Sequence, residues 1–154
     1  MIRTIERFTE DEHGDWVAEL SCLHRQHVRH QPPFVQRPWV LTEEGRAEHL
    51  GRQLDCPLCD RAELPPGLAV ARVAGPFDAS TLPAALRSAH RVADHTWGRL
   101  HVLEGSLGFT METTPPIDVR LGAGEEQAIP PGVPHALAVD GPVRVAIEFL
   151  TAPA

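Results

Sequence analysis

Polar and apolar residues alternate along several short stretches of this chain, a pattern typical of half-buried β-strands. In WVAELSC (16–22), four side chains share one face at a period of two: Trp16, Ala18, Leu20 and Cys22. RTIERF (3–8) predicts a strand before this stretch. HVRH (27–30) predicts another after a tight turn, ended by the prolines at 32 and 33. The chain is therefore expected to begin with a hairpin-based sheet.

One short helix is expected after these strands. Thr42 can cap its first turn, and Glu43 and Glu44 favour the positive end of its dipole. Gly51 is expected to end it after about Leu50. The Pro- and Gly-rich stretch 64–67 then reads as an exposed linker.

From about Pro76 onward, short apolar runs are bounded by glycine or proline, which predicts an all-β region. Residues 96–112 are expected to form two strands joined at Glu104-Gly105. The sequence therefore predicts two domains, residues 1–68 and 76–154. The predicted fold class is mainly β, with a small zinc-stabilised β-hairpin/helix domain followed by a cupin-like β-barrel of jelly-roll type.

Cysteine and histidine gather in the first domain in a pattern that favours zinc. Cys56 and Cys59 have the C-x-x-C spacing with which two thiolates reach one ion, and CLHRQHVRH (22–30) offers a second pair of ligands. Strand parity makes His24 the first partner for Cys22 and His27 the second. A redox C-x-x-C is the alternative, disfavoured because the motif is placed after a helix, and inert buried thiols are another.

The first domain also resembles a small uncharacterised bacterial Cys/His domain family. The resemblance covers about residues 1–65 and rests on DWVAELSC, HVRH, RPWV and the closing C-x-x-C. That family is expected to have glycine between the cysteine and the first histidine, where this chain has Leu23. The resemblance supports a zinc site and implies no activity.

The second domain carries one recognisable motif, G-x5-P-x-G-x2-H, which ends at His135. It is similar to the second cupin motif, although Val139 stands where that motif closes with asparagine. Gly98 stands where the first cupin motif has its acidic ligand. Residues 77–151 as a whole resemble the TehB/YeaR-like cupins, which are related to tellurite-resistance protein B. The resemblance implies a compact barrel linked to stress from toxic oxyanions or nitrosative conditions, without methyl transfer.

Three residues of the second domain are candidates for binding a second divalent metal in the barrel: His90, His135 and Glu148. His135 is expected to face the pocket. His90 has an equally good interpretation as a solvated residue, and the parity of Glu148 slightly favours solvent. His95 and His101 are expected on the surface. No catalytic residue can be assigned.

The net charge of −7 argues against a nucleic-acid-binding protein, and no apolar run is long enough to span a membrane. With three cysteines and no disulfide framework, a cytoplasmic protein is expected. We expect a small-molecule or metal-binding stress-tolerance protein, with a small-molecule or oxyanion ligand and homodimer formation as an open question. The alternatives are a metal-dependent cupin enzyme of dioxygenase or isomerase type and a regulatory protein that interacts through its zinc module.

Overall fold

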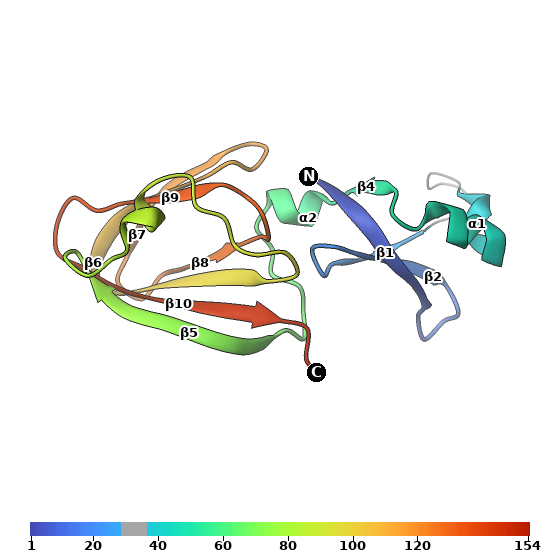
Figure 1. Cartoon of the computed structure of the whole chain (residues 1–154), viewed down its shortest axis with the longest axis horizontal. Coiled ribbons are helices and arrows are strands. Elements are labelled where there is room, and N and C mark those ends of the chain that lie inside the picture. The colour runs from blue at the N-terminus through green and yellow to red at the C-terminus, as the bar shows by residue number, and fades with distance from the viewer. Residues whose placement is uncertain (29–36) are drawn as a thin grey trace. The chain divides into compact units, whose positions relative to one another are not determined.

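A computed structural model describes residues 1–28 and 37–154. The predictions for His30 and for the prolines at 32 and 33 lie outside these ranges. The chain divides into two compact units, residues 2–56 (the smaller unit) and Met1 with residues 57–154 (the larger unit). Both are built mainly from antiparallel strands (Figure 1). The predicted mainly β fold class is therefore confirmed. Among the described residues, no helix combines the length and apolar character needed to cross a bilayer.

The smaller unit is a four-stranded sheet in the order β3-β2-β1-β4. Its strands are β1 (Ile2–Glu10), β2 (Trp16–Leu20), β3 (Arg25–His27) and β4 (Gln53–Asp55). The alternation expected for 16–22 is present in β2, which pairs with both β1 and β3. Strand β3 begins earlier than expected, at Arg25, because the turn after β2 takes only a few residues.

A 3-10 helix η1 (Pro38–Leu41) and a helix α1 (Glu43–His49) complete this unit. The Thr42 hydroxyl accepts a hydrogen bond from the Gly45 amide at 3.0 Å, as expected for a helix cap. The Arg46 guanidinium lies 3.7 Å from the centre of the Trp16 ring, which holds α1 against β2.

Replacing Thr42 by alanine should weaken α1 by about 1 kcal/mol, because the Gly45 amide loses its side-chain acceptor. Amide hydrogen exchange along α1 measures the change. The Glu48→Ala variant, at an exposed position of the same helix, is the control and should leave exchange nearly unchanged. Equal protection in both variants would show that the cap does not stabilise the helix.

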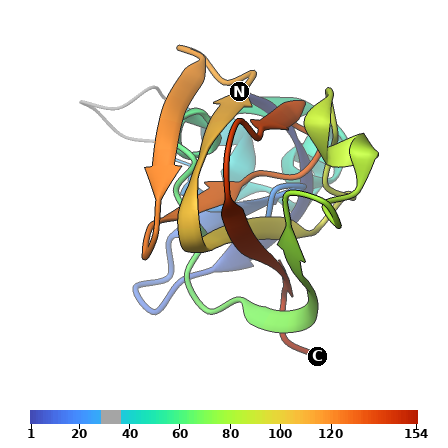
Figure 2. The ribbon, with the colours of Figure 1, turned by 90° about the vertical axis from the view of Figure 1, so that its left-hand side faces the viewer.

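The larger unit begins with the short helix α2 (Pro57–Asp60) and contains a second 3-10 helix, η2 (Ala84–Arg87). Its strands are β5 (Ala69–Asp78), β6 (Trp97–Met111), β7 (Ile117–Gly122), β8 (Glu126–Ile129), β9 (His135–Ala138) and β10 (Val143–Thr151). The first of them begins at Ala69, ahead of the expected 76. Seen end-on, these strands curl around a common centre (Figure 2).

Strand β6 organises the larger unit because four other strands pair with it. Its first half pairs with β8 and β10, and its second half pairs with β7 and β9. The expectation of two strands joined at Glu104-Gly105 was wrong: β6 runs through this point as one strand. Gly105, at φ +73°, provides a bend rather than a hairpin turn, because its two sides face different partner strands.

The hydrophobic core of this unit lies inside the curl. Alternate residues of β6 and β10 enter it, among them Leu100, Val102, Phe109, Val145 and Ile147, and the loop after β5 adds Leu82 and Leu86. Trp97 is completely buried, as expected for a structural residue. The polar side chains between these positions therefore lie on the other face of the strands.

Candidate metal centre and barrel histidines

A tight turn after β2 places Cys22 and His24 side by side. The Leu23 amide donates to the Leu20 carbonyl at 2.8 Å, and the Leu20 amide donates to the His24 carbonyl at 3.0 Å. Leu23 sits at the centre of the turn with φ +71°, in the left-handed region that favours glycine. This conformation explains why related sequences are expected to have glycine here.

The C-x-x-C pair is presented by a second turn. Cys56 follows β4, Pro57 opens α2, and Cys59 lies within that helix. The sequence argument had placed this motif after a helix, and that placement was wrong: it follows a strand and opens a helix, as redox motifs do. However, Cys56 and Cys59 are only 2% and 0% exposed, so neither thiol is accessible to a disulfide substrate.

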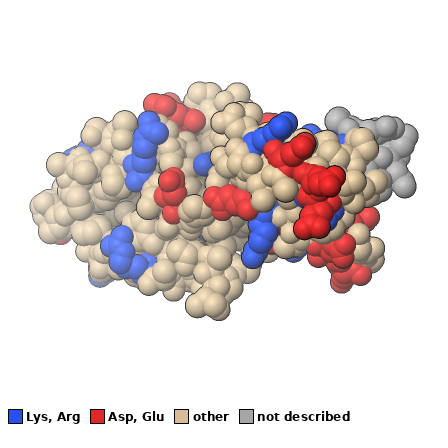
Figure 3. All heavy atoms as spheres, turned by 45° about the vertical axis from the view of Figure 1, so that its right-hand side comes forward, with Lys and Arg blue, Asp and Glu red and all other residues tan. Residues whose placement is uncertain are grey.

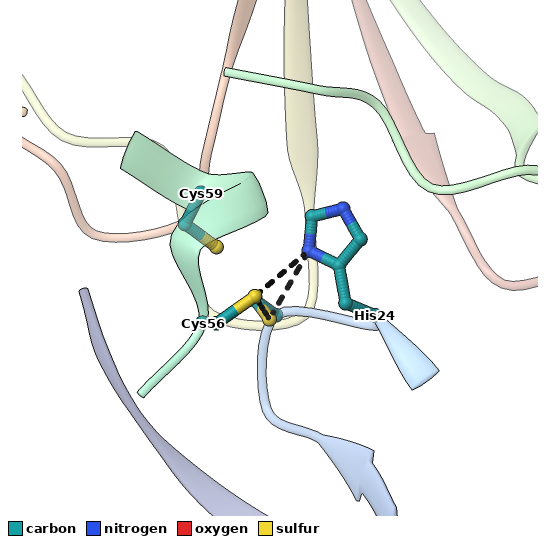
Figure 4. Close-up of side chains that lie close together, drawn as sticks. His24, Cys56 and Cys59 are labelled. Atoms are coloured by element: carbon teal, nitrogen blue, oxygen red, sulfur yellow. Dashed lines mark hydrogen bonds between the residues drawn. The ribbon is translucent and has the colours of Figure 1, made fainter. Parts of the chain in front are cut away.

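The four side chains Cys22, His24, Cys56 and Cys59 form one buried cluster, and their donor atoms all lie within 4.8 Å of one another. The Sγ atoms of Cys22 and Cys56 are 3.8 Å apart, and Nδ1 of His24 is 3.5 Å from each of them. Figure 4 shows the labelled His24 ring directed toward the sulfurs of Cys56 and Cys59. None of the three cysteines is in a disulfide.

These distances fit tetrahedral zinc. With Zn–S bonds of about 2.3 Å and Zn–N bonds of about 2.0–2.1 Å, a tetrahedron separates two sulfurs by about 3.8 Å and a sulfur from a nitrogen by about 3.6 Å. The donors are also of the type that zinc prefers, thiolate and imidazole. The cluster therefore offers the donor types and the close spacing that a tetrahedral metal ion needs.

His24 has an unusual protonation equilibrium when no metal is bound. Burial disfavours its charged form, but bonds to the sulfurs of Cys22 and Cys56 outweigh that effect and raise the pKa of His24 to about 9. Nδ1 must be free of its proton to bind an ion, so metal binding releases a proton from the cluster below this pKa. Acidification therefore opposes metal binding.

His27, the second choice for the ligand, lies elsewhere. It faces Val17 across the β2–β3 pair, and its Nε2 is 2.7 Å from Oδ2 of Asp11. The His27 side chain is 42% exposed, in contrast to the buried His24. Asp11 was not anticipated as its partner, because Asp11 follows β1 whereas His27 ends β3.

The two histidines of the larger unit are brought together. His90 and His135 form a β-bridge with backbone hydrogen bonds of 2.8 and 2.9 Å, and their ring centres are 5.5 Å apart. Both line a small cavity of about 20 Å³ whose other lining side chains are all apolar. The structure thus places His135 at this cavity, and its functional role there stays a prediction.

The hydrogen bonds of His135 define its tautomer. Nδ1 lies 3.0 Å from the Val133 carbonyl, so this nitrogen carries the proton and donates it. Nε2 is then left as an acceptor. Burial, together with the nearby His90, lowers the pKa of His135 and keeps the ring neutral.

Glu148 does not join these histidines. Its neighbours Ile147 and Phe149 line the cavity, so its own side chain points to the opposite face of β10. There it accepts hydrogen bonds from Arg99 at 2.7 Å and from His101 at 2.9 Å. The bond to His101 and the Arg99 charge lower the pKa of Glu148, which stays ionised.

The fold and the site together describe a two-part β protein with a Cys₃His cluster and a small cavity lined by His90 and His135. Comparison with known families agrees with this division. Residues 73–147 match the family described as "TehB-like domain", and residues 7–63 match the family described as "Protein of unknown function (DUF3565)". The chain therefore carries a TehB-like domain and, before it, a domain of the DUF3565 family. Both resemblances noted in the sequence are confirmed.

Solved structures show the same fold in the larger unit. A crystal structure of an Escherichia coli K12 protein is 21% identical with a TM-score of 0.53, covering 60% of this chain and 98% of that one. TehB from Haemophilus influenzae is 20% identical with a TM-score of 0.50 and covers 56% of this chain. This chain spans only 32% of the length of that TehB. No curated protein matched the sequence.

Proposed function

We propose that this chain is a small-molecule-binding protein whose TehB-like domain holds the ligand and whose preceding domain is stabilised by one structural zinc ion. The observation that carries the proposal is the buried cluster of Cys22, His24, Cys56 and Cys59, whose donor atoms all lie within 4.8 Å of one another. No other group of three or more such donors occurs among the described residues.

The donor set supports a structural and not a catalytic ion. Three thiolates and one imidazole complete a tetrahedral shell, so no coordination position is left for water or substrate. All four residues are at most 3% exposed. In the small Cys/His domain, such an ion would supply folding free energy by tying two turns that are distant in the sequence together.

The ligand function is assigned to the cavity between His90 and His135. It combines apolar walls with two imidazoles, the usual composition of a small-molecule site. Figure 3 shows arginine and acidic side chains interspersed on the displayed face, with no broad basic area among its described residues. The proposal therefore includes no nucleic-acid partner.

Zinc content tests the proposal through a matched pair of histidine variants. We expect about one zinc per chain in the wild type and in His27→Ala, and almost none in His24→Ala, because only His24 lies beside the sulfurs. Elemental analysis of the purified proteins measures this. Zinc that is lost equally in both variants, or in neither, would contradict the assigned ligand set.

A further inference from the structure

The cavity of the larger unit offers too few donors for a metal ion. Apart from His90 and His135, its walls are aliphatic or aromatic. The position of the acidic ligand in related barrels is occupied by Gly98, and the carboxylate of Glu148 bonds Arg99 and His101 on the opposite face of β10. Two imidazoles alone fall short of the three protein ligands typical of a catalytic site.

Space gives a second argument. A cavity needs a volume of about 10–15 Å³ to hold one water molecule, and the volume of this cavity is about 20 Å³. An ion bound by two imidazoles would need at least two further donors to reach four-coordination. The described pocket has room for roughly one water-sized group, not for an ion with two waters.

Charge gives a third argument. The Arg72 guanidinium lies 4.2 Å from the centre of the Phe149 ring, and Phe149 forms part of the cavity wall. No carboxylate among the lining residues would offset the two positive charges of a divalent ion. A cation beside an apolar cavity makes the entry of a second cation more costly.

The same features suit an uncharged group that can donate a hydrogen bond. Nε2 of His135 is an acceptor, because Nδ1 is committed to the Val133 carbonyl. The His90 side chain makes no hydrogen bond with the described residues, so either of its nitrogens can donate or accept. His90 and Phe149 are partly exposed, which places the opening of the pocket beside them.

From the proposed ligand-binding function and these three arguments, we infer that the barrel pocket works without a metal and binds the hydroxyl group of a small, largely apolar molecule. Inside the pocket, the hydroxyl donates to Nε2 of His135 and accepts from His90. The apolar remainder extends out of the pocket through the opening beside Phe149. Without a ligand, one water molecule takes the place of the hydroxyl.

The metal part is tested on the full-length, zinc-loaded protein. The wild type and the His135→Ala variant are incubated with excess Mn²⁺, Fe²⁺, Co²⁺ or Ni²⁺, dialysed, and analysed for total metal per chain. We expect the same total metal in both proteins. A second equivalent that the wild type retains and His135→Ala loses would overturn the inference, while leaving the barrel as a ligand-binding domain.

The ligand part uses phenol and anisole, which differ mainly in the hydroxyl hydrogen. Side-chain NMR signals of His135 and His90 report binding. Phenol should bind about tenfold more tightly than anisole, because only phenol satisfies the acceptor on His135. His135→Ala should remove this preference, and His101→Ala, on the outer face of β6, should keep it.

Equal affinity for phenol and anisole would overturn the hydrogen-bonding role of the two imidazoles. Absence of any shift with either compound would contradict both the inferred ligand class and the proposed ligand pocket. The zinc content of the Cys₃His centre is independent of these results, so each failure can be told from the others.

Discussion

The Cys56→Ser variant is expected to lose its zinc and, with it, the folded structure of the smaller unit. Cys56 supplies one of four buried donors, and a serine hydroxyl does not replace a thiolate toward zinc. Structural zinc contributes about 10–16 kcal/mol of binding free energy in small zinc-binding peptides, which is comparable to the whole net stability of about 5–15 kcal/mol typical of a folded domain. Limited proteolysis and amide exchange in β1 and β2 measure the loss.

A strong chelator added to the wild type should produce the same change. The Ser21→Ala variant is the control, because Ser21 adjoins Cys22 and accepts only one 3.2 Å hydrogen bond, from the Thr4 amide. It should retain its zinc. A Cys56→Ser protein with native protection of β1 and β2 would show that the ion is not required for folding.

A second large loss of stability is expected when Gly105, the residue at which β6 bends, is replaced by alanine. A Cβ atom there would lie 2.0 Å from the Pro142 carbonyl oxygen, which is far inside any tolerated contact, and the φ of +73° is also unfavourable for alanine. Gly105→Ala should therefore destabilise the larger unit by at least about 3 kcal/mol. Urea unfolding followed by circular dichroism measures this change.

Gly124 provides the matched control. It has a similar φ of +87°, but a Cβ atom there would meet nothing within 4 Å. Gly124→Ala should thus show the conformational cost alone, about 1–2 kcal/mol. If the two variants were equally stable, the contact between the bend of β6 and Pro142 would not be what requires glycine.

The structure brings together four cysteine and histidine side chains that the sequence marks by residue type and spacing. Cys56 and Cys59 are recognisable by their C-x-x-C spacing, and Cys22 is the remaining cysteine of the chain. The choice of His24 over His27 agrees with the structure, but for a different reason from the one given. The sequence argument assumed an extended chain, whereas the left-handed turn at Leu23 is what turns His24 toward the sulfurs.

The arrangement of β6 could not be predicted in the same way. Its two halves look like two strands because Gly105 interrupts them, and a glycine fits both a hairpin turn and a bend. The difference lies in the partners: Gly105 pairs with Val143, about forty residues further along the chain. Pairing over such distances leaves no local pattern in the residues concerned.

The hydrogen-bond partners of Glu148 could not be predicted from the sequence either. Its parity between Ile147 and Phe149 correctly favoured the outer face, but Arg99 and His101 reach it from β6, across the sheet. Conversely, the pairing of His90 with His135 depends on the loop from 79 to 96 returning to β9. The alternation of apolar and polar residues predicts which face of a sheet a side chain occupies. It does not predict which residue of the next strand lies beside that side chain.

The central position of β6 also sets the order in which the chain can fold as it is synthesised. β5 pairs only with β10, and β10 in turn pairs with the first half of β6. The larger unit therefore cannot close until residues 143–151 have left the ribosome. The four donors of the Cys₃His cluster, in contrast, are complete once Cys59 has emerged. The first part of the chain, up to Cys59, can thus take up the proposed zinc ion and fold while the barrel is still being made.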